Sequence, residues 1–270
     1  AVSGGRSPVP GREHTTYRRW CAHLYERARR LDTVDFWAAQ LEGPDPDLGA
    51  RRVRPGTDRA ADLVVGVAAA DPDVTARLLS SSQPMPQLLT AAAGRTVTAW
   101  RRRRGQPTPP PLLALETHGR ASGIVAGGVD TSETVGLLSA IYPLRIDPTN
   151  YADMPGDGID FGLLRYLRPD TAEKLSGYRE PQLLLNYLGR ADVGTGGVLT
   201  MDRGLLTEVS VLPEPRLAVR HELTVMAAVL PHGDAPVLAT QWRTLPDVLT
   251  AADITVLQSL WHDALREVVS

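Results

Sequence analysis

The chain has 270 residues, of which 43% are hydrophobic and 22% are charged, and its formal net charge is −2. This length is enough for one large domain or two small ones, and the near-neutral charge gives no reason to expect nucleic acid or an acidic membrane surface as a partner. Cys21 is the only cysteine, which excludes an intrachain disulfide and a cysteine-based metal cluster and fits a reducing cytoplasm.

The N-terminal residues 1–13 contain no apolar stretch, so they do not resemble a signal peptide. Their content of Gly, Pro and Ser is typical of a linker, and we interpret them as the remnant of a longer chain. No apolar run in the sequence approaches the roughly 20 residues of a membrane span.

In the first part of the chain, apolar residues recur mostly at three- and four-residue spacing, which predicts helices. One strand is predicted between them. Asp32 and Thr33 are a possible cap at the start of the second helix. In the helix that starts at 71–73, Val74, Leu78 and Leu79 are predicted to face the protein core. The elements in chain order are two helices over 14–41, a loop over 42–57, a strand at 61–69, a helix starting at 71–73 and a long helix over 87–104.

Four consecutive arginines, 101–104, close the long predicted helix. One interpretation is a nucleic-acid contact, and the other is a cationic last turn beside the negative end of the helix dipole, with Gly105 as the C-terminal cap. The near-zero net charge and the lack of interleaved aromatic residues favour the structural interpretation.

The second part of the chain alternates strands and helices and ends on an amphipathic helix. The predicted elements are strands at 112–117 and 141–146, a helix at 161–167, strands at 183–188, 206–212, 217–230 and 237–242, and a helix at 251–269. The last three strands are expected to be antiparallel. The fold class is therefore α/β, with a mixed, largely antiparallel sheet flanked by helices.

Polar groups gather where the strand 112–117 ends, in the sequence Glu116-Thr117-His118-Gly119-Arg120. Glu and His are both proton carriers, so this strand end is the best candidate for a reactive site. A carboxylate that moves a proton usually works against a second titratable group, and the sequence supplies no obvious one. No phosphate-binding loop, nucleophile elbow or zinc motif is present, and the six histidines show no metal-ligand spacing, so no metal is expected.

Four segments, in order, resemble the epimerization domains of nonribosomal peptide synthetases, which belong to the condensation-domain superfamily. The segments are Leu115–Arg120, similar to E-G-H-G-R-E after its first residue; Glu133–Pro143, similar to R-T-V-G-W-F-T-x-x-Y-P; Pro155–Gly162, similar to P-x-x-G-x-G-Y-G; and Leu185–Gly189, similar to F-N-Y-L-G. The resemblance covers residues 14–270 and only the second half of such a domain. The H-H-x-x-x-D-G motif of the first half, which carries the family's best-known catalytic histidine, is absent.

The resemblance implies a chloramphenicol-acetyltransferase-like C-terminal lobe over 57–270, preceded by a helical segment over 14–56 that joins two lobes. It implies interconversion of the L and D configuration at Cα of an aminoacyl or peptidyl thioester, with Glu116 as a catalytic proton carrier. His118, Arg120, Asn186 and Tyr187 match motif positions expected to bind the substrate or the pantetheine. The thioester would be delivered on the 4'-phosphopantetheine arm of a peptidyl carrier protein, and no cofactor would be bound directly.

Alternatives to these roles remain open. His118 is more often a hydrogen-bonded structural residue at such a position, and Arg120 either orients Glu116 or satisfies backbone carbonyls. The chain departs from the family pattern at Thr117, Ala121, Leu137 and Asp160. The chain could thus be a lobe of a peptide-bond-forming condensation domain or a degenerate, non-catalytic module that docks a carrier protein. A lobe alone would lack its N-terminal partner lobe, be inactive, and expose an apolar face through which it could self-associate.

Overall fold

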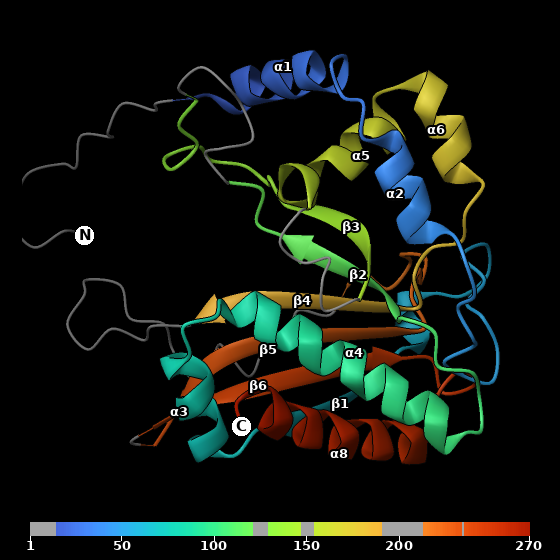
Figure 1. Cartoon of the computed structure of the whole chain (residues 1–270), viewed down its shortest axis with the longest axis vertical. Coiled ribbons are helices and arrows are strands. Elements are labelled where there is room, and N and C mark those ends of the chain that lie inside the picture. The colour runs from blue at the N-terminus through green and yellow to red at the C-terminus, as the bar shows by residue number, and fades with distance from the viewer. Residues whose placement is uncertain (1–14, 121–128, 147–153, 191–212, 234) are drawn as a thin grey trace, which may run out of the picture.

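The computed structural model describes residues 15–120, 129–146, 154–190, 213–233 and 235–270. Six strands among them form one sheet in the order β1-β6-β5-β4-β2-β3 (Figure 1). The strands are β1 Val64–Ala69, β2 Leu112–Thr117, β3 Ala140–Arg145, β4 Leu183–Arg190, β5 Leu223–His232 and β6 Ala235–Thr244. The helices are α1 Tyr17–Ala28, α2 Val34–Leu41, α3 Pro72–Ser80, α4 Met85–Arg103, α5 Ile159–Tyr166, α6 Pro169–Ser176 and α8 Ala251–Val268, with short 3-10 turns at Ala60–Asp62 and Pro155–Gly158.

The sheet is mixed, as predicted. The pairs β1–β6, β5–β6 and β2–β3 are antiparallel, whereas β2–β4 and β4–β5 are parallel. Parallel neighbours end at the same edge of a sheet, so the C-terminal ends of β2 and β4 lie side by side. This arrangement brings two of the sequence motifs together, and the predicted fold class is confirmed.

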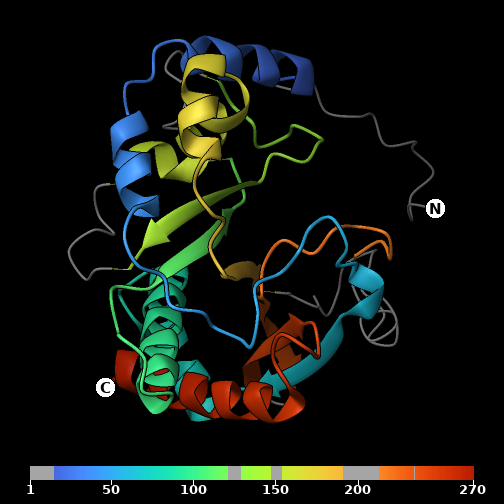
Figure 2. The ribbon, with the colours of Figure 1, turned by 90° about the vertical axis from the view of Figure 1, so that its right-hand side faces the viewer.

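One face of the sheet is covered by α3, α4 and α8, with α4 and α8 lying side by side (Figures 1 and 2). The predicted apolar stripe of α4 is buried, and its members are Leu88, Leu89, Ala92, Val97 and Trp100. Trp261 of α8 packs edge-on against Trp242 of β6, with ring centroids 6.1 Å apart. Each fully buried side chain of leucine size contributes about 1.5–3 kcal/mol relative to exposure, so this face contributes substantially to stability.

The helices α1, α2, α5 and α6 group beyond the β3 edge of the sheet (Figure 1). Trp37 of α2 is fully buried, and its ring lies 6.1 Å from that of Tyr142 and 5.6 Å from that of Phe161. Trp37 and Tyr142 belong to the main core, so α2 packs with the sheet. A smaller cluster around Trp20 joins α1 to α5. The boundary at residue 56 between a joining segment and a lobe stays a prediction.

Most of the predicted elements are confirmed, with three differences. The helix α6 was not predicted, because its eight residues carry a short, mostly polar pattern. Leu79 is 36% exposed, so the prediction that it faces the core was wrong. Residues 217–222 are not part of β5 and form only an isolated bridge between Ala218 and Arg59, so that strand was predicted too long. The predicted strand at 206–212 lies outside the described residues.

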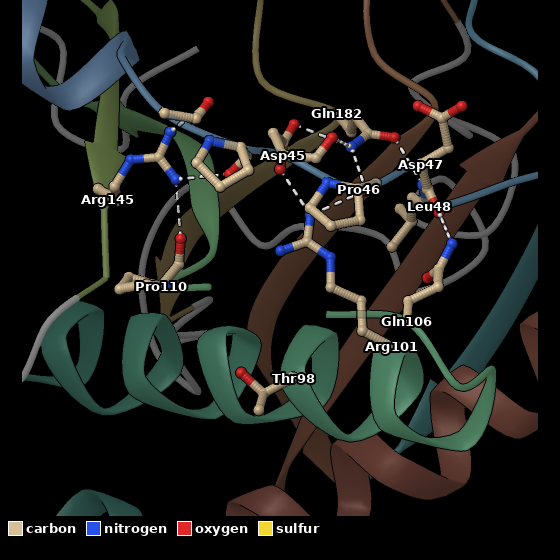
Figure 3. A network of polar contacts seen from close by, with 12 residues as sticks. Asp45, Pro46, Asp47, Leu48, Thr98, Arg101, Gln106, Pro110, Arg145 and Gln182 are labelled. Atoms are coloured by element: carbon tan, nitrogen blue, oxygen red, sulfur yellow. Dashed lines mark hydrogen bonds and ion pairs between the residues drawn. The ribbon is translucent and has the colours of Figure 1, made fainter. Parts of the chain in front are cut away.

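The loop predicted over 42–57 is irregular, as expected, but polar side chains hold it against the sheet (Figure 3). Asp45 accepts a 2.5 Å hydrogen bond from Arg101 and a 2.8 Å bond from the amide of Gln182. Oε1 of Gln182 in turn accepts from the backbone N–H of Leu48 at 2.6 Å. Arg101 is 1% exposed, so this first arginine of the four-residue run is structural.

Arg145, at the end of β3, fixes the start of the same loop (Figure 3). Its guanidinium donates to the backbone carbonyls of Gln40, Glu42, Pro44 and Pro110, at distances of 2.5–3.1 Å. Orphan carbonyls at the end of α2 are satisfied in this way. The loop is therefore bound to β3, to α4 and to Gln182, which directly precedes β4. Among the described residues, no helix has the length and apolar character to cross a membrane.

Candidate functional site

Two motif residues meet at the shared C-terminal edge of β2 and β4. Leu115 of β2 pairs with Leu185 of β4, and one residue further along Nδ2 of Asn186 donates a 2.6 Å hydrogen bond to Oε2 of Glu116. Both side chains are half-buried. The other carboxylate oxygen, Oε1, makes no hydrogen bond within the part of the chain that the structure describes. The carboxylate of Glu116 thus has one oxygen fixed by the Asn186 amide and a second oxygen that is available to accept a proton.

His118 and Arg120 form a tight turn directly after β2. The backbone N–H of Arg120 donates to Nδ1 of His118 at 3.0 Å, and His118 is exposed. Gly119 between them has φ +67°, and a Cβ there would lie 1.8 Å from the carbonyl oxygen of Leu138. Only glycine fits this position, because it has no Cβ and accepts a left-handed conformation at little cost.

The guanidinium of Arg120 satisfies backbone carbonyls, one of the two roles expected for it. It donates to the carbonyl oxygens of Thr131 at 2.6 Å and Thr134 at 2.9 Å, with a longer contact to that of Gly136 at 3.4 Å. Arg120 therefore holds the loop 129–139, which carries the second motif. No bond from Arg120 to Glu116 is present among the described residues.

The loop 129–139 is also fixed from the other side, by the start of α1. The Thr134 hydroxyl donates to the carbonyl of Thr15 at 2.5 Å, and the Tyr17 hydroxyl donates to the carbonyl of Leu137 at 3.2 Å. The side chains of Val135 and Leu137 project into solvent and are 86% and 81% exposed. Leu137 stands where the family motif has Trp, so this departure lies on an exposed tip.

Tyr187 is not brought to Glu116. Side chains alternate along a strand, so Tyr187 points to the opposite face from Asn186 and packs against the main core. Burial raises the pKa of its hydroxyl. The alternation of side chains along β4 puts Tyr187 on the other face of the sheet from Glu116. A role for Tyr187 in binding stays a prediction.

The third motif, Pro155–Gly162, builds the turn into α5. Gly156, Asp157 and Gly158 all have positive φ, and a Cβ on Gly158 would lie 2.1 Å from the ring of Tyr142. Asp160, a departure from the family pattern, is 1% exposed and forms two bonds with Arg27 of α1, at 2.6 and 2.8 Å. The departure therefore has a partner, which the sequence does not reveal because Arg27 is one of 29 basic residues.

The described residues contain no group of three His, Cys, Asp or Glu side chains that could hold a metal ion. Ala121, another departure from the family pattern, lies outside the described residues. Its contribution to the site stays a prediction.

Sequence comparison finds similarity between this chain and short parts of several large curated synthases. No protein-family model matches it. It is 28% identical over 200 residues to a linear gramicidin synthase of Brevibacillus parabrevis, covering 66% of this chain and 2% of that protein. It is 25% identical over 259 residues to bacitracin synthase 1 of Bacillus licheniformis, covering 85% of this chain and 4% of that protein. The chain thus spans only a few per cent of the length of these curated relatives.

Solved structures give the fold. The epimerization domain from the third module of tyrocidine synthetase B superimposes with a TM-score of 0.74 at 19% identity, covering 97% of this chain and 60% of that one. The chain has an epimerization- and condensation-type fold. The cyclization-docking bidomain EpoB of Sorangium cellulosum gives a TM-score of 0.59 at 16% identity, covering 98% of this chain and 53% of that one. The X-domain from teicoplanin biosynthesis, in its complex with OxyB, gives a TM-score of 0.58 at 16% identity, covering 98% of this chain and 60% of that one. The resemblance found in the sequence motifs is confirmed.

Proposed function

We propose that the chain is the C-terminal lobe of an epimerization domain that interconverts the L and D configuration at Cα of a carrier-bound aminoacyl or peptidyl thioester. The observation that carries this proposal is the contact between Glu116 and Asn186. Two motifs 70 residues apart in the chain meet in one half-buried carboxylate–amide pair at a sheet edge. A proton carrier needs this combination of a fixed orientation and a free oxygen.

In the proposed reaction, Oε1 of Glu116 takes the proton from Cα of the thioester. The Cα–H bond breaks, its electron pair delocalises into the thioester carbonyl as an enolate, and an O–H bond forms on Glu116. A second group then returns a proton to Cα from the opposite face. The reverse reaction exchanges the two roles.

The second group is proposed to lie on a partner lobe. No imidazole or carboxylate of the described residues is bonded to the free oxygen of Glu116, and the resemblance assigns the partner histidine to an N-terminal lobe. The 270-residue chain therefore supplies one wall of the site. A peptidyl carrier protein would deliver the thioester on its phosphopantetheine arm, and the exposed His118 at the strand end offers a hydrogen-bonding group to the amides of that arm.

The test uses the intact synthetase module that contains this chain. An L-aminoacyl thioester deuterated at Cα is loaded on its carrier, and loss of deuterium and appearance of the D-form are followed with and without Glu116→Gln. We expect a loss of about 10²- to 10⁴-fold in the variant, the usual contribution of a general acid–base group. Unchanged exchange would contradict the role of Glu116, and exchange by the 270-residue chain alone would contradict the two-wall site.

A non-catalytic docking role is the second candidate, and one observation favours it. Val135 and Leu137 are strongly exposed on a loop that Arg120 and α1 hold in a fixed conformation. A rigid apolar tip is typical of a protein-contact surface. The X-domain, a neighbour in fold, was solved in complex with another protein, OxyB. An intact module that binds its carrier yet exchanges no Cα deuterium would favour this role.

A further inference from the structure

A cavity beside the candidate site carries a group of cations that the proposed reaction does not use. It encloses about 100 Å³ between α5, α6, β3 and the segments that lead into β4 and β5. Its apolar wall includes Ala114, Ile141 and Phe161. A volume of this size holds several water molecules or the charged end group of a small ligand.

Three arginines line the cavity, each from a different part of the chain: Arg165 of α5, Arg179 after α6, and Arg220 before β5. Arg165 stacks over the ring of Tyr166 at 5.4 Å. Within the described residues, neither Arg165 nor Arg179 has a carboxylate partner. Two guanidinium groups are thus free to bind an anion through paired N–H groups.

The remaining polar groups of the cavity leave it cationic. Glu180 faces Arg220 at 3.3 Å, but their side chains are 45% and 60% exposed, and such exposed pairs are weak. Burial lowers the pKa of His221 and so disfavours a positive charge on its ring, although the bond that Nδ1 donates to the carbonyl of Pro181 at 2.8 Å acts in the opposite direction. One carboxylate therefore stands against three guanidinium groups.

The cavity lies on the sheet face that carries the carboxylate–amide pair, and Ile141 in its wall is the partner of Glu116 across β2 and β3. Ala114, in its wall, lies two residues before Glu116 on β2, so the two side chains point to the same face. The rise of a strand puts them about 7 Å apart. A ligand held in the cavity by an anionic group would extend an apolar body along this face toward Glu116.

We propose that this cavity is a binding site for a carboxylate or phosphate attached to an aromatic or aliphatic group. Binding itself does not depend on the proposed function. Only the further step, that the ligand is an acidic part of the thioester substrate or of its arm, rests on that function.

The test is calorimetric titration of the 270-residue chain with benzoate, phenyl phosphate and, as the uncharged comparison, benzyl alcohol. We expect both anions to bind, with benzyl alcohol at least about tenfold weaker, and Arg165→Gln and Arg179→Gln each to weaken anion binding about tenfold. The matched control is Arg77→Gln, an exposed arginine of α3 on the far side of the molecule (Figure 1), which should change nothing.

The outcomes separate cleanly. Equal binding of benzyl alcohol, no binding of either anion, or unchanged affinity in both cavity variants would overturn the site. Tighter binding of benzoate supports the site and assigns it to a carboxylate of the substrate, and tighter binding of phenyl phosphate supports it and assigns it to the phosphate of an arm. Normal anion binding with unchanged Cα exchange in Glu116→Gln would overturn the proposed function and leave the site standing, whereas loss of exchange in that variant with no anion binding would overturn the site alone.

Discussion

Nδ2 of Asn186 lies 2.6 Å from Oε2 of Glu116 and donates a hydrogen bond to it across the parallel pair β2 and β4. The bond fixes one oxygen of the carboxylate and so restricts where the other can be. We interpret Asn186 as a positioning residue that acts through Glu116. A positioning role and a merely structural role make different predictions for substitutions at residue 186.

In the intact module, Asn186→Ala should lower kcat for Cα exchange about 10- to 100-fold with little change in KM, because the base is misplaced. Asn186→Asp should act differently. Two adjacent carboxylates cannot both ionise easily, so one pKa of the pair rises and the rate should recover only at higher pH. The measurement is the pH profile of deuterium loss for both variants. Identical profiles for Ala and Asp would contradict the positioning role.

The sequence identified the residues of this pair but not their contact. Glu116 and Asn186 were found from motifs at two strand ends, whereas their bond depends on β2 and β4 being neighbours with β3 at the outer edge. That strand order is a tertiary outcome. Local patterns were sufficient for α4, whose apolar stripe is long and regular. They failed for residues 217–222, because this segment meets the chain around Arg59 only in one isolated bridge instead of a continuous ladder.

Buried ion pairs were the other feature that the sequence left open. Asp160 was noticed only as a departure from a motif, and the structure shows that Arg27, 133 residues earlier, neutralises it. Asp45 and Arg101 are likewise 56 residues apart. Any of many arginines could have served, so composition and spacing carry no signal for such pairs.

Asp160→Asn should destabilise the chain by about 3 kcal/mol, because it removes the charge of a buried carboxylate that forms two bonds with Arg27. The matched control is Asp263→Asn, which removes a partner of Arg266 at an exposed site and should cost less than about 1 kcal/mol. Urea unfolding of both variants measures the difference. Equal losses would show that the Arg27–Asp160 pair contributes no more than a surface pair.

The turn at Gly119 offers a second test of the site's construction. Gly119 and Gly105 have nearly the same φ, +67° and +66°, but a Cβ at Gly105 meets nothing within 4 Å. Gly105→Ala should therefore cost only the backbone strain of about 1–2 kcal/mol. Gly119→Ala should cost clearly more, since its Cβ would collide with the carbonyl of Leu138. Denaturant midpoints of the two variants decide this, and a smaller loss at Gly119 would contradict the close approach.

The loop around Asp45 should behave as part of the core. Asp45→Asn removes the charge partner of buried Arg101 and should cost about 3 kcal/mol. Asp47→Asn is the control, because Asp47 is 54% exposed and pairs only with Arg52 among the described residues, so its loss should stay below about 1 kcal/mol. Limited proteolysis offers a second readout, with faster cleavage in 43–54 expected for the Asp45 variant alone. Equal cleavage of both variants would show that the loop is held by other contacts.

Glu222 should make stability fall with rising pH. Its side chain is 3% exposed, and burial raises the pKa of the carboxyl above its ordinary value of 4.5, although the backbone N–H of Val53 donates to it. The folded chain therefore retains a proton that the unfolded chain releases. The stabilisation is full below about pH 4.5 and is lost as the pH rises through the folded pKa.

Glu222→Gln keeps an acceptor for Val53 and removes the titration, so its free energy of unfolding should change less between about pH 4 and 8 than that of the natural chain. Glu133→Gln, at an exposed position, is the control and should preserve the natural pH dependence. Unfolding by guanidinium chloride at several pH values measures the slopes. A variant at residue 222 with an unchanged slope would mean that the unfolded and folded chains hold the same number of protons at Glu222.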